Sequence, residues 1–114
     1  MRVAMISGSY PPQPCGVGDY TARLVSELRA AKVEVDVFTT ALDEGRRDPP
    51  AHGEITDWRL STWWQASRLL LDRQYDVVHL QYPARFYGYR PDLAFLTYVV
   101  RRRLPRVPIV VTLH

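Results

Sequence analysis

The sequence contains very few of the residues that build covalent or metal cross-links, with a single cysteine, Cys15, in 114 residues. One cysteine excludes an internal disulfide, and it excludes a metal site built from a cysteine cluster. No apolar run reaches the ~20 residues of a membrane-spanning helix, and no signal-peptide pattern follows Met1. We therefore expect a cytoplasmic protein with no bound metal.

The sequence is also poor in lysine and in net charge. Lys32 is the only lysine, and the net charge is +3. A charge this small and this scattered makes no basic surface for nucleic acid, so we expect no nucleic-acid partner. Hydrophobic residues make up 46% and charged residues 24% of the chain, which is typical of a globular protein. The length allows one layered core, and we predict a single domain over residues 1–114.

Strand-like and helix-like patterns alternate along the chain. The order strand, helix, two strands, helix, strand, helix, strand is typical of an α/β fold with a parallel sheet and right-handed crossovers. We predict a Rossmann-like sheet with strand order 3-2-1-4-5, flanked by helices. The expected strands are residues 2–6, 33–38, 54–58, 75–82 and 109–113; the expected helices begin at residues 19, 61 and 91, and a surface loop covers 41–53.

Two of these elements carry expectations about which side chains are buried. In the second strand, Glu34 and Asp36 alternate with valines, so we expect one face of that strand to be partly exposed to water. In the second helix, paired tryptophans are more typical of a core than of a binding site. The expected inward face of that helix consists of Trp63, Trp64, Ser67, Leu70 and Leu71.

The last helix and strand raise the question of partners. Three arginines at 101–103 complement the dipole at the end of the third helix, and a peripheral membrane contact is the alternative interpretation. The strand at 109–113 is apolar on both faces and ends the predicted sheet. Because an unprotected edge pairs readily with another chain, we expect self-association through it.

The loop at residues 7–20 is the segment on which the functional prediction depends. Three prolines lengthen it, and Gly16 and Gly18 allow its backbone to approach a ligand closely before a helix that Asp19 can cap. A glycine-rich loop that enters a helix directs several N–H groups at one point, which suits a phosphate. An ordinary surface loop that uses glycine for its turns is the alternative interpretation.

A second group of polar residues lies at the carboxyl ends of expected strands. His114 ends the last strand, and His79 and Gln81 share one face of the fourth strand. Open α/β sheets bind ligands at this edge. His79 is more typical of a core histidine than of a ligand contact. Gln81 lies nearer the edge and is the better candidate for contact with a substrate.

Several motifs in this order resemble a known family. They are Met-Arg-Val-Ala-Met-Ile-Ser-Gly-Ser-Tyr-Pro-Pro at 1–12, Cys-Gly-Val-Gly-Asp-Tyr at 15–20, Glu-Val-Asp-Val-Phe-Thr at 34–39, Tyr-Asp-Val-Val-His-Leu-Gln-Tyr at 75–82 and Val-Thr-Leu-His at 111–114. The chain resembles the amino-terminal domain of a group 1 (GT4-like) glycosyltransferase of the two-domain GT-B fold. The resemblance covers the whole chain except residues 41–58.

The resemblance implies transfer of a sugar, with retention of anomeric configuration, from a nucleotide diphosphate sugar to a sugar or lipid-linked acceptor, without a separate cofactor. It implies that Gly16 and Gly18 present amides to the donor diphosphate. His114 would stand beside the transferred sugar as the catalytic residue. The remaining candidate substrate-binding residues are Asp19, Tyr20, Gln81, Tyr82 and Arg85. The family's second, nucleotide-binding domain has no counterpart here, so we expect a fragment that is inactive alone.

Two other interpretations remain. A nicotinamide-binding Rossmann domain would have Gly-x-Gly-x-x-Gly directly after the first strand and an acidic residue at the end of the second. The loop here is long and proline-rich, and the second strand ends in Phe38-Thr39-Thr40. A non-catalytic interaction module is the other alternative. The sequence also departs from the family at Lys32, where the family often has glycine, and this leaves the end of the first helix uncertain.

Overall fold

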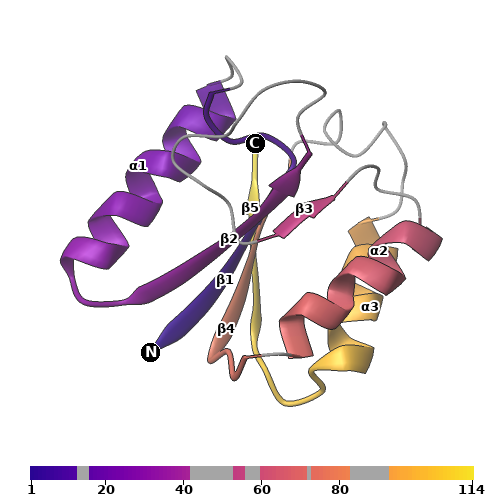
Figure 1. Ribbon diagram of the computed structural model, residues 1–114. Coiled ribbons are helices and arrows are strands. Elements are labelled where there is room, and N and C mark those ends of the chain that lie inside the picture. The colour runs from indigo at the N-terminus through magenta and orange to yellow at the C-terminus, as the bar shows by residue number, and fades with distance from the viewer. Residues whose placement is uncertain (13–15, 42–52, 56–59, 72, 83–92) are drawn as a thin grey trace.

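The computed structural model describes residues 1–12, 16–41, 53–55, 60–71, 73–82 and 93–114. They form a five-stranded sheet of order β3-β2-β1-β4-β5 in which all neighbouring strands are parallel (Figure 1). The predicted fold class and strand order are therefore confirmed. The elements are β1 (Arg2–Ser7), α1 (Gly16–Ala30), β2 (Glu34–Thr40), β3 (Gly53–Ile55), α2 (Leu60–Ala66), the 3-10 helix η1 (Ser67–Leu71), β4 (Val77–Tyr82), α3 (Leu93–Arg103) and β5 (Ile109–Leu113).

The helices cover opposite faces of the sheet, with α1 on one side and α2 and α3 together on the other (Figure 1). The crossover through α1 moves along the sheet in the opposite direction to the crossovers through α2 and α3, and right-handed connections then require opposite faces. Strand β1 contributes alternate side chains to the two cores. The α1-side core contains Val3, Met5, Tyr10, Val25, Val35 and Val37, and the opposite core contains Ala4, Ile6, Phe38, Ile55, Trp63, Leu70, Tyr75, Val78, Leu80, Val99 and Val100.

Helix α1 differs from the prediction at both ends. It begins at Gly16, three residues earlier than expected, so the prediction that Asp19 caps it is wrong. Asp19 lies instead in the first turn, where a carboxylate still complements the helix dipole. At the other end, Lys32 takes a left-handed φ of 66°. The amide of Val33 donates to the carbonyl of Leu28 (3.0 Å), so lysine completes a terminating turn that usually contains glycine.

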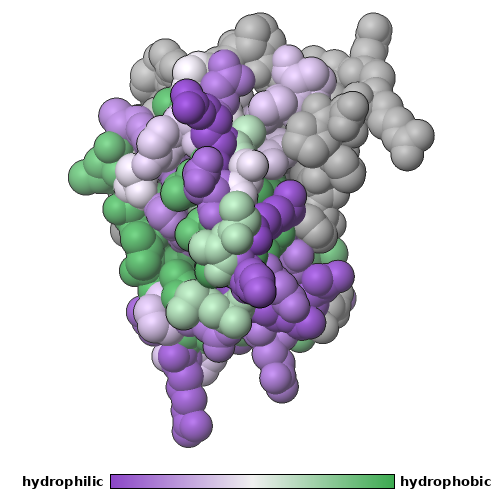
Figure 2. All heavy atoms as spheres, turned by 90° about the vertical axis from the view of Figure 1, so that its left-hand side faces the viewer, coloured by the Kyte–Doolittle hydropathy of each residue, from purple (hydrophilic) through white to green (hydrophobic). Residues whose placement is uncertain are grey.

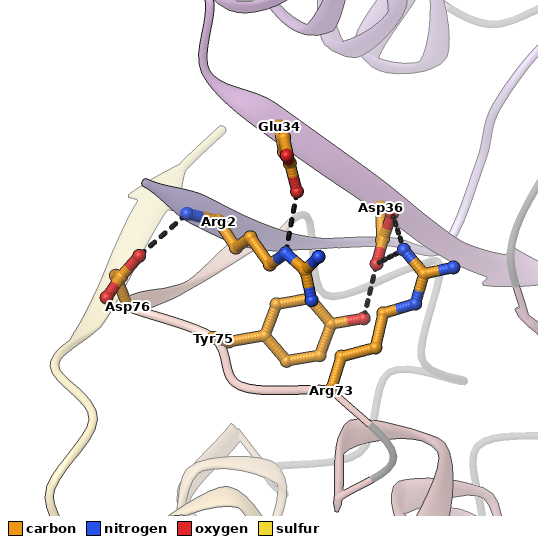
Figure 3. A network of polar contacts seen from close by, with 6 residues as sticks. All are labelled: Arg2, Glu34, Asp36, Arg73, Tyr75 and Asp76. Carbon is orange, nitrogen blue, oxygen red and sulfur yellow. Dashed lines mark hydrogen bonds and ion pairs between the residues drawn. The ribbon is translucent and has the colours of Figure 1, made fainter.

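The prediction of a partly exposed face on β2 is wrong at Asp36. This aspartate is only 6% exposed because two residues that precede β4 cover it (Figure 3). The Tyr75 hydroxyl donates to Asp36 Oδ2 (2.7 Å), and Arg73 Nη1 lies 3.0 Å from the same oxygen. Burial, and then the hydrogen bond to Asp36, raise the pKa of Tyr75 far above its ordinary value. Glu34, which is exposed, pairs with Arg2 at 2.6 Å.

The expected inward face of the second helix is correct for Trp63, Ser67 and Leu70, which are all buried. It is wrong for Trp64 and Leu71, which are 40% and 48% exposed. Trp64 follows Trp63 by about 100° around the helix, and the change to 3-10 geometry at Ser67 turns Leu71 outward.

The arginines at the end of α3 bond mainly to the protein itself. Arg101 donates to the carbonyls of Pro105 and Val107, and Arg103 donates to Ser67 Oγ and lies 4.1 Å over the Trp64 ring. These contacts join α3 to α2 and η1 and to the turn before β5, while Arg101 and Arg102 stay exposed, and a peripheral membrane contact stays a prediction. In the part of the chain that the structure describes, no helix has the length and apolarity to cross a membrane.

Strand β5 forms the edge of the sheet within the described residues, as predicted. Its Val110 and Leu113 side chains are 45% and 73% exposed, whereas Ile109 and Val111 are partly buried. Self-association through this edge stays a prediction.

Candidate functional site

The loop that follows β1 is held in place by short hydrogen bonds. The Ser7 hydroxyl donates to the Ser9 carbonyl (2.6 Å), and Ser9 N–H lies 3.4 Å from the same hydroxyl oxygen. From the end of β2, the Thr40 hydroxyl donates to the Gly8 carbonyl (2.7 Å). Ser7 and Ser9 are buried. The first part of the loop is therefore anchored to two neighbouring strands before the chain reaches α1.

The two glycines of the loop have different surroundings. A Cβ at Gly18 would lie 2.9 Å from Ser9 Oγ and 3.2 Å from the Tyr10 backbone nitrogen, so glycine is needed for α1 to approach the loop. Gly16 is exposed, and a Cβ there would have no atom within 4 Å. Gly18 thus serves helix packing, while Gly16 is open to a ligand at the start of the helix.

A chain of polar contacts lies on the α1 side of β4 and β5. His114 Nε2 lies 2.7 Å from Gln81 Oε1, and Gln81 Nε2 lies 3.3 Å from His79 Nε2. His79 Nε2 is also 2.7 Å from Thr112 Oγ1. Gln81 is completely buried. The contacts therefore lead from an exposed histidine at the end of β5 into the interior of the sheet.

Helix α1 reaches the same place. The Tyr20 ring meets the His114 ring edge-on, with centroids 5.5 Å apart and planes at 71°. Gly16, Asp19 and Tyr20 line one surface depression along α1. Figure 2 views the molecule from the α1 side and shows polar and apolar side chains mixed on this face, with apolar ones gathered at one flank.

The structure thus brings together most of the residues that the sequence suggested. Tyr20 and Gln81 both contact His114, and Gly16 and Asp19 lie shortly before Tyr20 at the start of α1. Gln81 faces His114 and not the solvent. Tyr82 ends β4, but its side chain is outside the described residues, as is Arg85.

Two residues of this cluster, Thr112 and Met5, were not expected from the sequence. Thr112 pairs with Gln81 in the β4–β5 register, and the Gln81 amide donates toward Met5 Sδ (3.6 Å). The strict alternation of side chains along parallel strands is the signal that finds them, because it places on one face of the sheet Met5, His79, Gln81, Thr112 and His114. Among the described residues, no group of three or more His, Cys, Asp and Glu side chains is arranged to hold a metal.

Burial, followed by the nearby charge of His114, lowers the pKa of His79 below its ordinary value of 6.5. The unfolded chain then binds a proton at higher pH than the folded chain does. The free energy of unfolding should therefore be greatest above pH 6.5 and should fall as the pH drops from 6.5 to the folded-state pKa. Urea titrations of the wild type and of His79→Gln at a series of pH values should show a shallower acid-side decline in the variant. Parallel declines would contradict this prediction.

Comparison with models of known protein families gives a match. The family model described as "Glycosyl transferase 4-like domain" matches residues 15–114. No curated protein sequence gives a significant match to the chain. The matched segment begins inside the loop at 7–20 and ends at His114, so it includes Gly16, the first turns of α1 and the polar residues of β4 and β5. The chain belongs to the glycosyl transferase 4-like domain family.

Proposed function

We propose that the chain is the acceptor-side domain of a retaining glycosyltransferase, which transfers a sugar from a nucleotide diphosphate donor to a sugar or lipid-linked acceptor. The observation that carries the proposal is the meeting of three features at the carboxyl ends of the strands: the open glycine that begins α1, the first turns of α1, and His114. A parallel sheet binds ligands at this edge, near the point where the strand order reverses between β1 and β4.

Gly16 supports the phosphate-binding part of the proposal. It is the first residue of a 15-residue helix, so its surroundings combine unpaired N–H groups with the positive end of the helix dipole. Among the described residues, no atom lies within 4 Å of a Cβ built at this position. The leaving diphosphate gains negative charge as the glycosidic bond breaks. Amides directed at that charge would stabilise the transition state in the manner of an oxyanion hole.

His114 supports the sugar-binding part. Its ring is exposed on one side and contacts Tyr20 and Gln81 on others. An imidazole in this place can exchange hydrogen bonds with a sugar hydroxyl or a phosphate oxygen. In this proposal Asp19 and Tyr20, at the exposed start of α1, contact a substrate, and Tyr82 and Arg85 complete the acceptor side.

The proposal includes a second domain that holds the nucleotide. The loop here offers only a few charge-assisted hydrogen bonds, each worth about 1.5–3 kcal/mol. Loss of ligand freedom on binding offsets most of that gain. The affinity of this chain alone for a nucleotide sugar should therefore be about millimolar or weaker.

Calorimetry tests whether tight binding of a nucleotide sugar requires the second domain. Titration of several nucleotide sugars into the 114-residue chain should give no resolvable heat. The transferase that carries this domain should bind one of them and transfer its sugar with retained anomeric configuration, as read by NMR of the product. Micromolar binding of a nucleotide sugar by the chain alone, or an inverted product, would overturn the proposal.

A further inference from the structure

We infer that Gln81 is a positioning residue that holds the imidazole of His114 in one tautomer and one orientation. The inference rests on the proposed function, because His114 matters to catalysis only if that proposal holds. Gln81 is 0% exposed, so it does not meet a substrate itself. Gln81 can therefore affect catalysis only through the side chains that it contacts.

The contact between the two residues fixes the proton on His114. The atom that faces His114 Nε2 is the Gln81 carboxamide oxygen, at 2.7 Å. A carboxamide oxygen accepts hydrogen bonds and cannot donate them. His114 Nε2 must therefore carry the proton, and Nδ1 of the neutral ring keeps its lone pair.

The orientation of the Gln81 carboxamide is fixed independently on its other side. Its nitrogen lies 3.6 Å from Met5 Sδ, an acceptor with no proton to give, and 3.3 Å from His79 Nε2. Burial lowers the pKa of His79, so its ring favours the neutral form, and Nε2 accepts the Gln81 amide proton when Nδ1 carries the ring hydrogen. The Thr112 hydroxyl, 2.7 Å away, can donate to the same nitrogen. Turning the amide over would place its oxygen against the Met5 sulfur, which has no proton to give.

The consequence is a defined chemical character for the exposed part of His114. With Nε2 engaged by Gln81, Nδ1 is the nitrogen left for a ligand, and in the neutral ring it is an acceptor. The edge-on contact with Tyr20 restrains the ring from a second direction. Gln81 thus makes His114 an oriented acceptor for a hydroxyl proton, whereas a ring free to change tautomer would present a donor in part of the population.

Nitrogen NMR of the His114 ring tests the inference without any activity assay. The test uses the 114-residue chain at a pH that keeps the ring neutral. The wild type should show mainly the Nε2–H form. Gln81→Met is similar in size but has no oxygen, and it should lower the ratio of Nε2–H to Nδ1–H about fivefold, the effect of one ordinary hydrogen bond. Gln81→Glu keeps an oxygen within reach and should restore the wild-type ratio.

Val25→Ala is the control, because it changes the packing of the same α1-side core without removing any of the hydrogen-bond partners described for Gln81. It should leave the tautomer ratio unchanged. A wild-type spectrum dominated by the Nδ1–H form would overturn the inference, even if Gln81→Met did not fold. An unchanged ratio in folded Gln81→Met would also overturn it.

Kinetics of the transferase that carries this domain separate this inference from the proposed function. Gln81→Met should lower kcat by up to roughly 100-fold with little change in KM, because misplacement of a reacting group costs turnover, and Gln81→Glu should recover most of the loss. If His114→Ala leaves kcat unchanged while the NMR result holds, the role proposed for His114 fails and the positioning contact stands. If His114→Ala lowers kcat but Gln81→Met does not, the inference is overturned and the proposed function stands.

Discussion

Gly16→Val in the transferase that carries this domain is expected to lower kcat by about 10²–10³-fold, which is the loss typical of removing one oxyanion-hole donor. The valine side chain would occupy the open space in front of the first amides of α1 and keep the diphosphate away from them. The loss should appear mainly in kcat and much less in donor affinity, because the contact strengthens as charge develops on the leaving group.

Steady-state kinetics and donor calorimetry on the same preparation measure the two effects separately. Gly16→Ala is the graded control, since its single methyl group leaves part of the space free. The Gly16→Val enzyme should have the same denaturant midpoint of unfolding as the wild type, because a Cβ at Gly16 meets nothing within 4 Å. A Gly16→Val enzyme that turns over at the wild-type rate would show that the diphosphate lies elsewhere.

Gly18→Val should lower the free energy of unfolding, whether or not a ligand is bound. Its Cβ would lie 2.9 Å from Ser9 Oγ, 3.2 Å from the Tyr10 nitrogen and 3.3 Å from the Ser9 carbonyl carbon. Two of these atoms are backbone, so relief requires α1 to move away from the loop. Overpacking of this kind costs about 3 kcal/mol of unfolding free energy.

Urea unfolding of the 114-residue chain measures that cost, with Gly16→Val as the control of equal size. The control should stay within about 0.5 kcal/mol of the wild type, as is usual for an exposed position. Equal stability of the two valine variants would mean that the close approach at Gly18 does not contribute to holding α1 in place.

The fold followed from the sequence because its determinants are local. Alternation in β2, the apolar run of β1 and the 3.6-residue repeat of α1 specify element types, and the handedness of crossovers then leaves few ways to order the strands. The position of the site followed from the same argument, because parallel strands bring their carboxyl ends to one edge. His114 and the glycine loop could therefore be placed near each other without coordinates.

The contacts that depend on distant residues could not be predicted in this way. Asp36 looked like a solvent-facing residue because its partners, Arg73 and Tyr75, lie 37 and 39 positions further along the chain. Gln81 looked like a substrate contact because its strand position reveals the edge of the sheet but not the depth of its side chain. Local patterns give the face on which a residue lies, whereas its burial depends on what else packs there.

The polar cluster in Figure 3 affects the geometry of the site from the far end of the sheet. Arg2 bonds through its amide to Asp76 (2.7 Å) and through its guanidinium to Glu34 (2.6 Å), and so it joins β1 to the residue just before β4 and to β2. A shift of one strand by a single residue would break these bonds and would also turn every side chain of that strand to the other face. For β4, that shift would carry Gln81 away from His114 and into the opposite core. The register of the strands, which the bonds of Arg2 fix at the amino ends, therefore determines which side chains can meet at the carboxyl ends.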